Sequence, residues 1–399
     1  MLRKNYPGLL LFLFTTTAFS FCSCVNDLKL SPEANEAIEN FSQKVAQDIA
    51  EDDIGCITAA VVKNGEVVWS KGFGLADKEN NIPAEPVTIG RTGSISKSFT
   101  AVLMMALVEK GVILLDDPVY KYLPEINQLK DKPDGAVPIT FRHLASHTAG
   151  LIREPGLEGA ASGPIGEWTQ QILRSIPTTS YQSLPGEKYS YSNIGFGMLG
   201  YALERAAGMP FMQMMKEYIF NPLGMENTTF IISEDQKEIL SKGYAVRRDG
   251  TVDAEQPFLE HNGRGYKIPN GGIYSNVIDQ AKFIGAMTGI EKYRILSDES
   301  LEQIHSVQNR SASGGEIQTP DNNETKYGLG FFIYEYPDDG ITLTGHSGSV
   351  SGYNAFLVYD RESKLGVVMF RNYSRGKTNL NRDARALLVE LIKIEKSGL

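Results

Sequence analysis

The stretch Gly93-Ser94-Ile95-Ser96-Lys97-Ser98-Phe99 opens the clearest helical pattern in the chain. Beyond it, apolar residues recur at helical spacing, at Val102, Leu103, Ala106 and Leu107. Gly111, directly after Lys110, supplies a C-terminal stop. We therefore expect a helix that begins near Ser94, with Ser94 as its N-cap or a first-turn residue.

Ser94 and Lys97 are three positions apart, so on a helix they share one face with Cβ atoms about 5 to 6 Å apart. A serine hydroxyl needs an adjacent base to act as a nucleophile, and a lysine serves when burial or cationic neighbours lower its pKa. The N–H groups at a helix start also favour negative charge on an attacked oxygen. A plainer interpretation stays open, in which Ser94 caps the helix and Lys97 is a solvated first-turn residue.

The first 23 residues have the pattern of a secretory signal, with Arg3-Lys4 followed by the apolar run Leu9 to Phe14. This run is too short for the roughly 20 apolar residues that a bilayer requires. Cleavage after Ser20 and lipidation at Cys24 are both consistent with the residues that follow. We expect an exported protein, either periplasmic or a membrane-anchored bacterial lipoprotein, with residues 24–32 as a linker.

Net charge, cysteine content and length each limit what this protein can be. The formal charge is −9, and removal of Arg3 and Lys4 with the export segment makes it −11, which argues against nucleic acid as a partner. Cys22 and Cys24 lie in or next to the export segment, so Cys56 is expected to be unpaired. The chain of 399 residues exceeds the roughly 250 to 300 residues of one hydrophobic core, so two joined subdomains are expected.

The ends of the chain predict a sheet covered by helices. Ser31-Pro32 starts a helix with an apolar face, and Asn64-Gly65 joins two strand-like runs, Ile57 to Lys63 and Val67 to Lys71, as a hairpin. Four late runs joined by short turns are strand-like: Leu329 to Tyr336, Ile341 to Thr344, Ala355 to Tyr359 and Gly366 to Arg371. An amphipathic helix follows them.

The middle of the chain is predicted to be mainly helical. A helix is expected to start at Asp116-Asp117-Pro118, and five further helical patterns follow at Ile139 to Ser146, Gly166 to Ser175, Ile194 to Ala207, Phe211 to Phe220 and Val277 to Met287. A hairpin is expected from Tyr244 to Val252, and a polar loop from Gln308 to Lys326. We predict an α+β fold over residues 33–396, with an antiparallel sheet part (about 33–90 and 327–396), flanked by the terminal helices, and a helical part (about 91–326).

Two other stretches offer partners for Ser94 and Lys97. Tyr189-Ser190-Tyr191-Ser192-Asn193 holds a tyrosine that could shuttle a proton and an amide that could bind a carbonyl. Thr344-Gly345-His346-Ser347-Gly348-Ser349 has glycines that let a substrate lie close to a strand edge. Taken singly, each stretch is also consistent with a polar loop or a glycine-rich strand end.

Together these motifs resemble the penicillin-recognising serine hydrolases, which include class C β-lactamases, low-molecular-weight penicillin-binding proteins, and esterase and D-aminopeptidase relatives. Three motifs match in the family's order: Ser94-x-x-Lys97, Tyr191-x-Asn193 and His346-x-Gly348. Supporting stretches match as well, at Ile139 to Leu151, Pro222 to Met225 and Pro269 to Ser275. The resemblance covers roughly residues 35 to 395 and implies a β-lactamase-like (DD-peptidase) fold.

The resemblance also implies roles for these residues. Ser94 would be acylated, Lys97 would help to deprotonate it, and Tyr191 would pass the proton to the leaving group. Asn193 would bind the substrate amide, and the third motif, with His346, Gly348 and Ser349, would line the substrate site. The backbone N–H groups of Ser94 and Ser349 would form the oxyanion hole.

One departure from the family bears on the substrate. Class C β-lactamases usually carry lysine where this chain has His346, and histidine is mostly neutral near pH 7. The histidine form resembles the esterase, D-aminopeptidase and some D,D-peptidase branches. We therefore expect a peptidase or esterase acting on a cell-wall peptide, a D-amino-acid peptide or an ester, with a class C-like β-lactamase and a non-catalytic module that binds cell-wall peptides as alternatives.

No metal or other cofactor is expected. His143 and His147 are spaced i, i+4 and could in principle bind zinc, but no glutamate lies between them and no other cluster of ligands is evident. The oligomeric state does not follow from the sequence.

Overall fold

The computed structural model describes residues 29–308 and 325–398. The predicted signal segment, with its alternatives at Ser20 and Cys24, lies outside the described residues. Most of the polar loop predicted from Gln308 to Lys326 also lies outside them.

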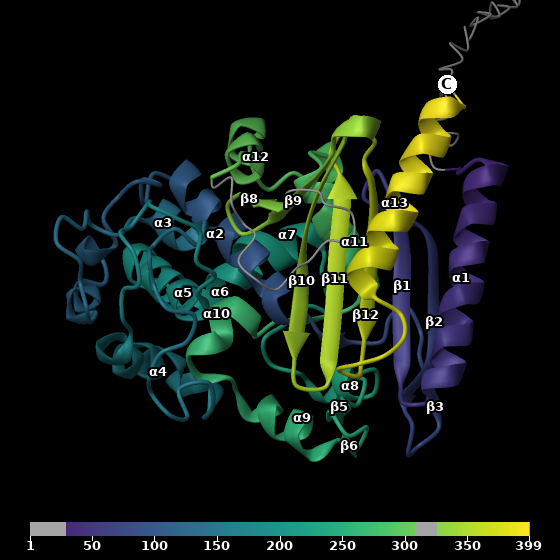
Figure 1. Ribbon diagram of the computed structural model, residues 1–399, viewed down its shortest axis with the longest axis horizontal. Coiled ribbons are helices and arrows are strands. Elements are labelled where there is room, and N and C mark those ends of the chain that lie inside the picture. The colour runs from purple at the N-terminus through teal and green to yellow at the C-terminus, as the bar shows by residue number, and fades with distance from the viewer. Residues whose placement is uncertain (1–28, 309–324, 399) are drawn as a thin grey trace, which may run out of the picture.

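An antiparallel sheet of eight strands forms the centre of the molecule, in the order β3-β2-β1-β12-β11-β10-β9-β8 (Figure 1). Its strands are β1 Cys56–Lys63, β2 Glu66–Asp77, β3 Ile82–Pro83, β8 Thr325–Tyr327, β9 Phe332–Tyr336, β10 Ile341–Val350, β11 Tyr353–Asp360 and β12 Leu365–Arg371. The pairing of β1 with β12 joins the first hairpin to the late strands, as predicted. Two short pairs lie apart from it, β4 Gly90–Arg91 with β7 Tyr274–Ser275 and β5 Ala245–Val246 with β6 Val252–Asp253.

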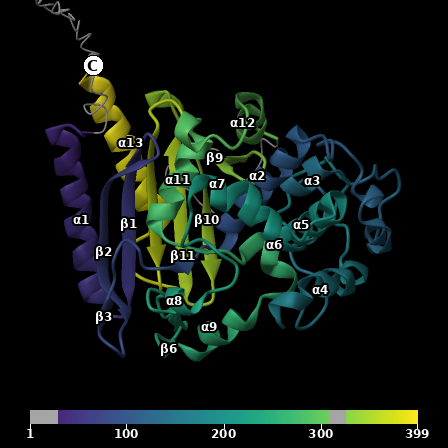
Figure 2. The same cartoon turned by 180° about the vertical axis from the view of Figure 1, so that it is seen from behind.

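The two terminal helices cover one face of this sheet (Figures 1 and 2). In α1 (Pro32–Asp52) the Ser31 side chain caps the first turn, and the apolar face packs on the sheet beside α13 (Leu380–Ser397). The opposite face carries α11 (Val277–Met287), which contacts β1, β2 and β12. Thus α11, although it falls within the range predicted for the helical part, lies on the sheet.

The remaining helices build the part of the molecule beside the sheet. They are α2 Ser96–Glu109, α3 Phe141–Ala145, α4 Trp168–Ser175, α5 Asn193–Ala207, α6 Phe211–Met215, α7 Asn221–Leu223, α8 Glu234–Lys237, α9 Glu255–Leu259, α10 Ile268–Gly271 and α12 Asp298–His305. The predicted helix at Asp116-Asp117-Pro118 is wrong, because Pro118 is extended and only short 3₁₀ turns follow it. The Asp117 carboxylate accepts a hydrogen bond from the N–H of Leu114, at 2.8 Å, on the other side of the turn.

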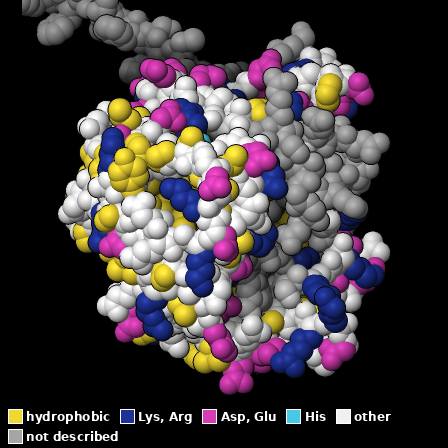
Figure 3. Space-filling view, turned by 60° about the vertical axis from the view of Figure 1, so that its left-hand side comes forward, with side chains coloured by type: hydrophobic (Ala, Val, Ile, Leu, Met, Phe, Trp, Pro, Cys, Tyr) yellow, Lys and Arg dark blue, Asp and Glu magenta, His cyan; other side chains and the backbone are white. Residues whose placement is uncertain are grey.

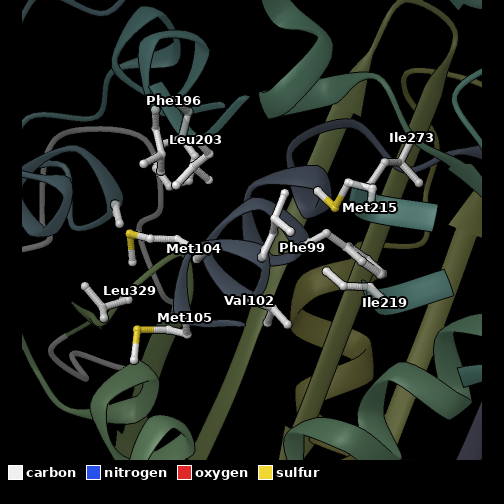
Figure 4. Close-up of a cluster of buried hydrophobic side chains, with 14 of the residues drawn as sticks. Phe99, Val102, Met104, Met105, Phe196, Leu203, Met215, Ile219, Ile273 and Leu329 are labelled. Carbon is white, nitrogen blue, oxygen red and sulfur yellow. The ribbon is translucent and has the colours of Figure 1, made fainter. Parts of the chain in front are cut away.

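Helix α2 is the centre of the larger hydrophobic core. Every residue from Ser96 to Leu107 is buried, so the helix is enclosed on all sides rather than amphipathic. Its Phe99 stacks on Phe283 of α11 with ring centroids 3.8 Å apart, and Val102, Met104 and Met105 pack into the same cluster (Figure 4). This packing fixes α2, and with it the segment that precedes α2, against the sheet.

Candidate active site

Ser94 lies just before α2 and not inside its first turn. The residues Gly93–Ile95 form a 3₁₀ turn, α2 begins at Ser96, and its N-cap position is Ile95. The α-helix therefore begins two residues after Ser94, and its N-cap is one residue later than predicted, because a 3₁₀ turn that starts at Gly93, with a φ of +53°, leads into it. The turn leaves the Ser94 side chain partly exposed.

Strand β10 packs backbone against backbone on this turn. A Cβ atom on Gly348 would lie 1.8 Å from the carbonyl oxygen of Thr92 and 3.2 Å from the nitrogen of Ser94. A Cβ atom on Gly93 would lie 2.6 Å from the nitrogen of Ser349. Only glycine permits this approach at both positions. As a result, the backbone nitrogens of Ser94 and Ser349 lie close to each other.

Lys97 is fully buried beneath Ser94. Its Nζ lies 3.0 Å from Ser94 Oγ, and in the neutral form it accepts from that hydroxyl while its two N–H groups donate to Asn193 Oδ1 at 2.8 Å and to the carbonyl oxygen of Asn270 at 3.3 Å. Burial holds the pKa of Lys97 well below its usual value, and the nearby positive charge of Arg153 lowers it further. A neutral amine in hydrogen-bond contact with a serine hydroxyl can accept its proton.

Tyr191 contacts Lys97 through its aromatic ring. The centroid of its ring is 4.7 Å from Lys97 Nζ and 4.2 Å from the ring of His147. Asn193, at the start of α5, accepts from Lys97 and donates from Nδ2 to Glu154 Oε1 at 2.5 Å, so both ends of its amide are held. The structure therefore brings Ser94, Lys97, Tyr191 and Asn193 together from two separate segments.

His346 lies on β10 with a ring that is 1% exposed. Its Nδ1 donates to the carbonyl oxygen of Ser347 at 2.6 Å, and its Nε2 accepts from the hydroxyl of Tyr327 at 3.3 Å. Burial, with a smaller effect of Lys97, lowers the pKa of His346 to about 3. The imidazole is neutral at physiological pH and offers no positive charge to a substrate.

Strand β10 has an accessible edge and borders a cavity. Strand β9 pairs with β10 only as far as Gly345, so the residues beyond it have no partner strand on that side among the described residues. On the other side of β10, a cavity of about 550 Å³ is lined by Ser347, Gly348 and Ser349, by residues of β11 and by the segment that leads into and begins α13, including Arg375 and Arg382. The edge beyond Gly345 can receive an extended substrate beside Ser94.

Sequence reasoning missed several residues of this site. Glu154 holds the amide of Asn193, and Asn270 both accepts from Lys97 and donates to the carbonyl oxygen of Asn193 at 2.9 Å. Asn270 belongs to a stretch that the resemblance had marked, whereas no spacing pointed to Glu154.

His147 holds the Tyr191 loop. Its carbonyl oxygen accepts from the N–H of Ser190 at 2.7 Å, and its Nδ1 accepts from the N–H of Ser192 at 3.0 Å. The Nδ1 of His143 instead accepts from Thr140, and His147, with a φ of +58°, lies beyond the end of α3, so the two histidines do not lie on one helix face. Among the described residues no group of three or more His, Cys, Asp and Glu side chains could hold a metal ion, and no helix there is long and apolar enough to cross a bilayer.

Comparison with known proteins agrees with this architecture. Residues 41–391 match the protein family described as Beta-lactamase. The chain is 28% identical over 335 residues to the D-alanyl-D-alanine-carboxypeptidase/endopeptidase AmpH of Escherichia coli, an alignment that covers 81% of this chain and 83% of AmpH. It is also 28% identical over 351 residues to Beta-lactamase-like protein 2 of Dictyostelium discoideum, covering 84% of this chain and 59% of that protein.

A solved structure has the same fold. The octameric penicillin-binding protein homologue from Pyrococcus abyssi superposes with a TM-score of 0.70 at 27% sequence identity, covering 90% of this chain and 77% of that chain.

Proposed function

The chain belongs to the β-lactamase family of serine hydrolases, and from this premise we propose that it cleaves amide or ester bonds through an acyl-enzyme on Ser94. The observation that carries the proposal is the 3.0 Å contact between Lys97 Nζ and Ser94 Oγ, made by a lysine whose pKa is held well below its usual value. The expected substrates are D-amino-acid peptides, cell-wall peptides or esters.

The geometry supports a two-step reaction. Lys97 in its neutral form accepts the proton of Ser94 as Oγ attacks the substrate carbonyl carbon, and the negative charge on the carbonyl oxygen is stabilised by the backbone N–H groups of Ser94 and Ser349. Tyr191 passes the proton to the leaving amine or alcohol, which departs as the carbonyl re-forms. Water then hydrolyses the ester on Ser94 through the same proton carriers.

Two observations bear on the substrate. His346 is buried and neutral, and its ring centroid lies 6.5 Å from that of Tyr191. We infer that it helps to position Tyr191 and does not contact a substrate carboxylate. Its assignment to the substrate site stays a prediction. Arg375 lines the cavity that adjoins β10 together with Arg382, whose Nε is paired with Asp383 Oδ1 at 2.7 Å, and a guanidinium there is suited to an anionic group of a substrate. Because a neutral His346 stands where class C β-lactamases usually carry lysine, we favour a peptidase or esterase over a β-lactamase.

We also propose, from the first 23 residues, that the enzyme is exported. The sheet part and the helical part predicted from the sequence would then form the two halves of the exported domain, with Ser94 between them.

Labelling tests the nucleophile. Intact-mass analysis after treatment with a fluorophosphonate and with a fluorescent penicillin should show one adduct on the wild-type enzyme and none on Ser94→Ala. The matched control is Ser98→Ala, which removes a buried hydroxyl on the same helix that donates to the carbonyl oxygen of Gly330, and it should still be labelled. A full adduct on Ser94→Ala would remove Ser94 from the mechanism.

Turnover tests the substrate class. We expect kcat/KM for a D-alanyl-D-alanine peptide, a D-amino-acid p-nitroanilide or p-nitrophenyl butyrate to exceed that for nitrocefin. Much faster hydrolysis of nitrocefin than of the other three would place the β-lactamase alternative first. Absence of all turnover by a protein that also resists labelling would favour the non-catalytic binding module.

A further inference from the structure

Three charged side chains lie together beside Asn193. Lys267 Nζ is 3.1 Å from Glu154 Oε2, and Arg153 Nε is 3.9 Å from Glu154 Oε1. The Glu154 carboxylate also accepts from Asn193 and from the hydroxyl of Tyr266. Two cations thus share one carboxylate, and the cluster carries one excess positive charge.

A second cluster, again of two cations and one carboxylate, lies near the first. Glu260 Oε2 is 2.9 Å from Arg91 Nη1 and 3.2 Å from Arg264 Nε. Arg264 Nη1 donates to the carbonyl oxygen of Gly271 at 3.0 Å, and a Cβ atom on Gly271 would lie 3.9 Å from the carbonyl carbon of Gly93. This cluster reaches the turn that carries Ser94 and adds another excess positive charge.

The positive charge is concentrated near the nucleophile. The whole chain has a formal charge of −9, and on the described part of the face in Figure 3 acidic and basic side chains are interspersed. His346 adds no charge at neutral pH, because its pKa is about 3. A site of one sign with apolar walls raises the local concentration of substrates of the opposite sign.

The position of Arg153 suits it to bind an anion. Its side chain is 49% exposed, and its guanidinium carbon lies 4.8 Å from the centroid of the Tyr191 ring. Stacking on a ring uses the flat face of a guanidinium, whereas the N–H donors of any guanidinium lie in its plane, in a geometry that matches a carboxylate. Lys267 is 19% exposed and supplies a second positive charge on the far side of Glu154.

We propose that Arg153 and Lys267 form a subsite for a carboxylate on the acyl side of the substrate. We place the subsite on the acyl side because Glu154, which joins the two cations, is hydrogen-bonded to Asn193, the residue to which the resemblance assigns the substrate amide. The opposite side of Ser94 is bordered by β10. This inference rests on the proposed acyl-enzyme function and adds that anionic acyl groups are preferred.

Two esters that differ in one group test the subsite. The mono-p-nitrophenyl ester of adipic acid carries a free carboxylate at the far end of its acyl chain, and its methyl ester is the neutral match with the same leaving group. For the wild-type enzyme, kcat/KM should be at least about tenfold higher for the carboxylate, mainly through KM, and the ratio should fall as salt is added. The ratio should fall about tenfold or more in Arg153→Met and in Lys267→Met.

A matched control is Arg174→Met, which removes an exposed arginine from α4 and should leave the ratio at its wild-type value. A wild-type ratio of one or less, or an unchanged ratio in the double variant Arg153→Met/Lys267→Met, would overturn the subsite alone. A fall in the ratio with Arg382→Met in place of Arg153→Met would move the carboxylate to the cavity beside β10 and also overturn it. Failure of the wild-type enzyme to hydrolyse either ester would instead overturn the function on which the subsite rests.

Discussion

Substitution of Gly348 by alanine should separate the two halves of the proposed oxyanion hole. The added Cβ would lie 1.8 Å from the carbonyl oxygen of Thr92, so β10 and the Gly93 turn must move apart by roughly 1.5 Å to reach ordinary contact. A misplacement of about 1 Å can cost roughly a hundredfold in rate, and loss of one oxyanion donor costs about 10² to 10³. We expect kcat/KM for p-nitrophenyl butyrate to fall at least about a hundredfold, and stability to fall by about 1 to 3 kcal/mol.

The same strand offers a control that separates activity from stability. A Cβ atom on Gly345 would lie 2.2 Å from the carbonyl oxygen of Leu357, a clash with the neighbouring strand β11 that does not involve the Ser94 turn. Urea unfolding should show a similar loss of stability for Gly345→Ala and Gly348→Ala, while only Gly348→Ala loses most of its turnover. Equal losses of turnover in both variants, or near-normal turnover in Gly348→Ala, would refute the role given to this contact.

Four further predictions follow from the site and the export segment. Because burial holds the pKa of Lys97 low, the folded protein binds fewer protons than the unfolded chain between this lowered pKa and about 10.4. Urea unfolding at several pH values should therefore show wild-type stability rising relative to Lys97→Met over that window, and a flat difference would contradict it. The charge of Lys267 lowers the pKa of Lys97 and that of Glu154 raises it, so the acidic limb of kcat/KM against pH should move to higher pH in Lys267→Met and to lower pH in Glu154→Gln. His147 has a φ of +58°, and its Nδ1 accepts a hydrogen bond. Asparagine tolerates this backbone and keeps an acceptor, so His147→Asn should retain kcat within roughly tenfold, while His147→Ala should lose more. Equal kcat values in the two variants would exclude a positioning role for His147. Detergent fractionation of Cys24→Ser should show loss of membrane association if Cys24 is lipidated, and unchanged association would rule out a lipid anchor there.

Local signals predicted much of the fold. Ser31 caps α1 and Pro32 begins it, as their residue types indicate. Asn64 and Gly65 have φ values of +53° and +76°, as expected for the tight hairpin that joins β1 and β2. Short turns fixed the antiparallel order of the late strands. These features depend on neighbours in the chain, so a single sequence contains the information for them.

The interior of the site depends on contacts that no spacing records. Lys97 meets Asn270 across 173 positions of sequence, and Glu154 meets Asn193 across 39. The segment of α11 reads as one more helix of the middle region, and only packing places it on the sheet. His147 is spaced from His143 like a zinc ligand, yet it holds a backbone N–H instead. Helical spacing indicated Ser94 and Lys97 as a pair, and residue type made Tyr191 and Asn193 candidates, but only the resemblance joined the two segments into one site, because it supplied long-range information that periodicity does not contain.

The burial of Lys97 connects the stability of this protein with its proposed chemistry. A charged ammonium in a dry interior costs far more than a neutral amine, so the enclosure of α2 on all sides favours the form of Lys97 that can accept a proton. Its three hydrogen bonds, to Ser94, Asn193 and Asn270, replace those lost to water. When Lys97 takes the proton of Ser94, the new positive charge arises in the same dry space, among the like charges of Arg153 and Lys267. That charge is tolerable only while negative charge develops on the substrate oxygen a few bonds away, which ties protonation of Lys97 to formation of the acyl-enzyme.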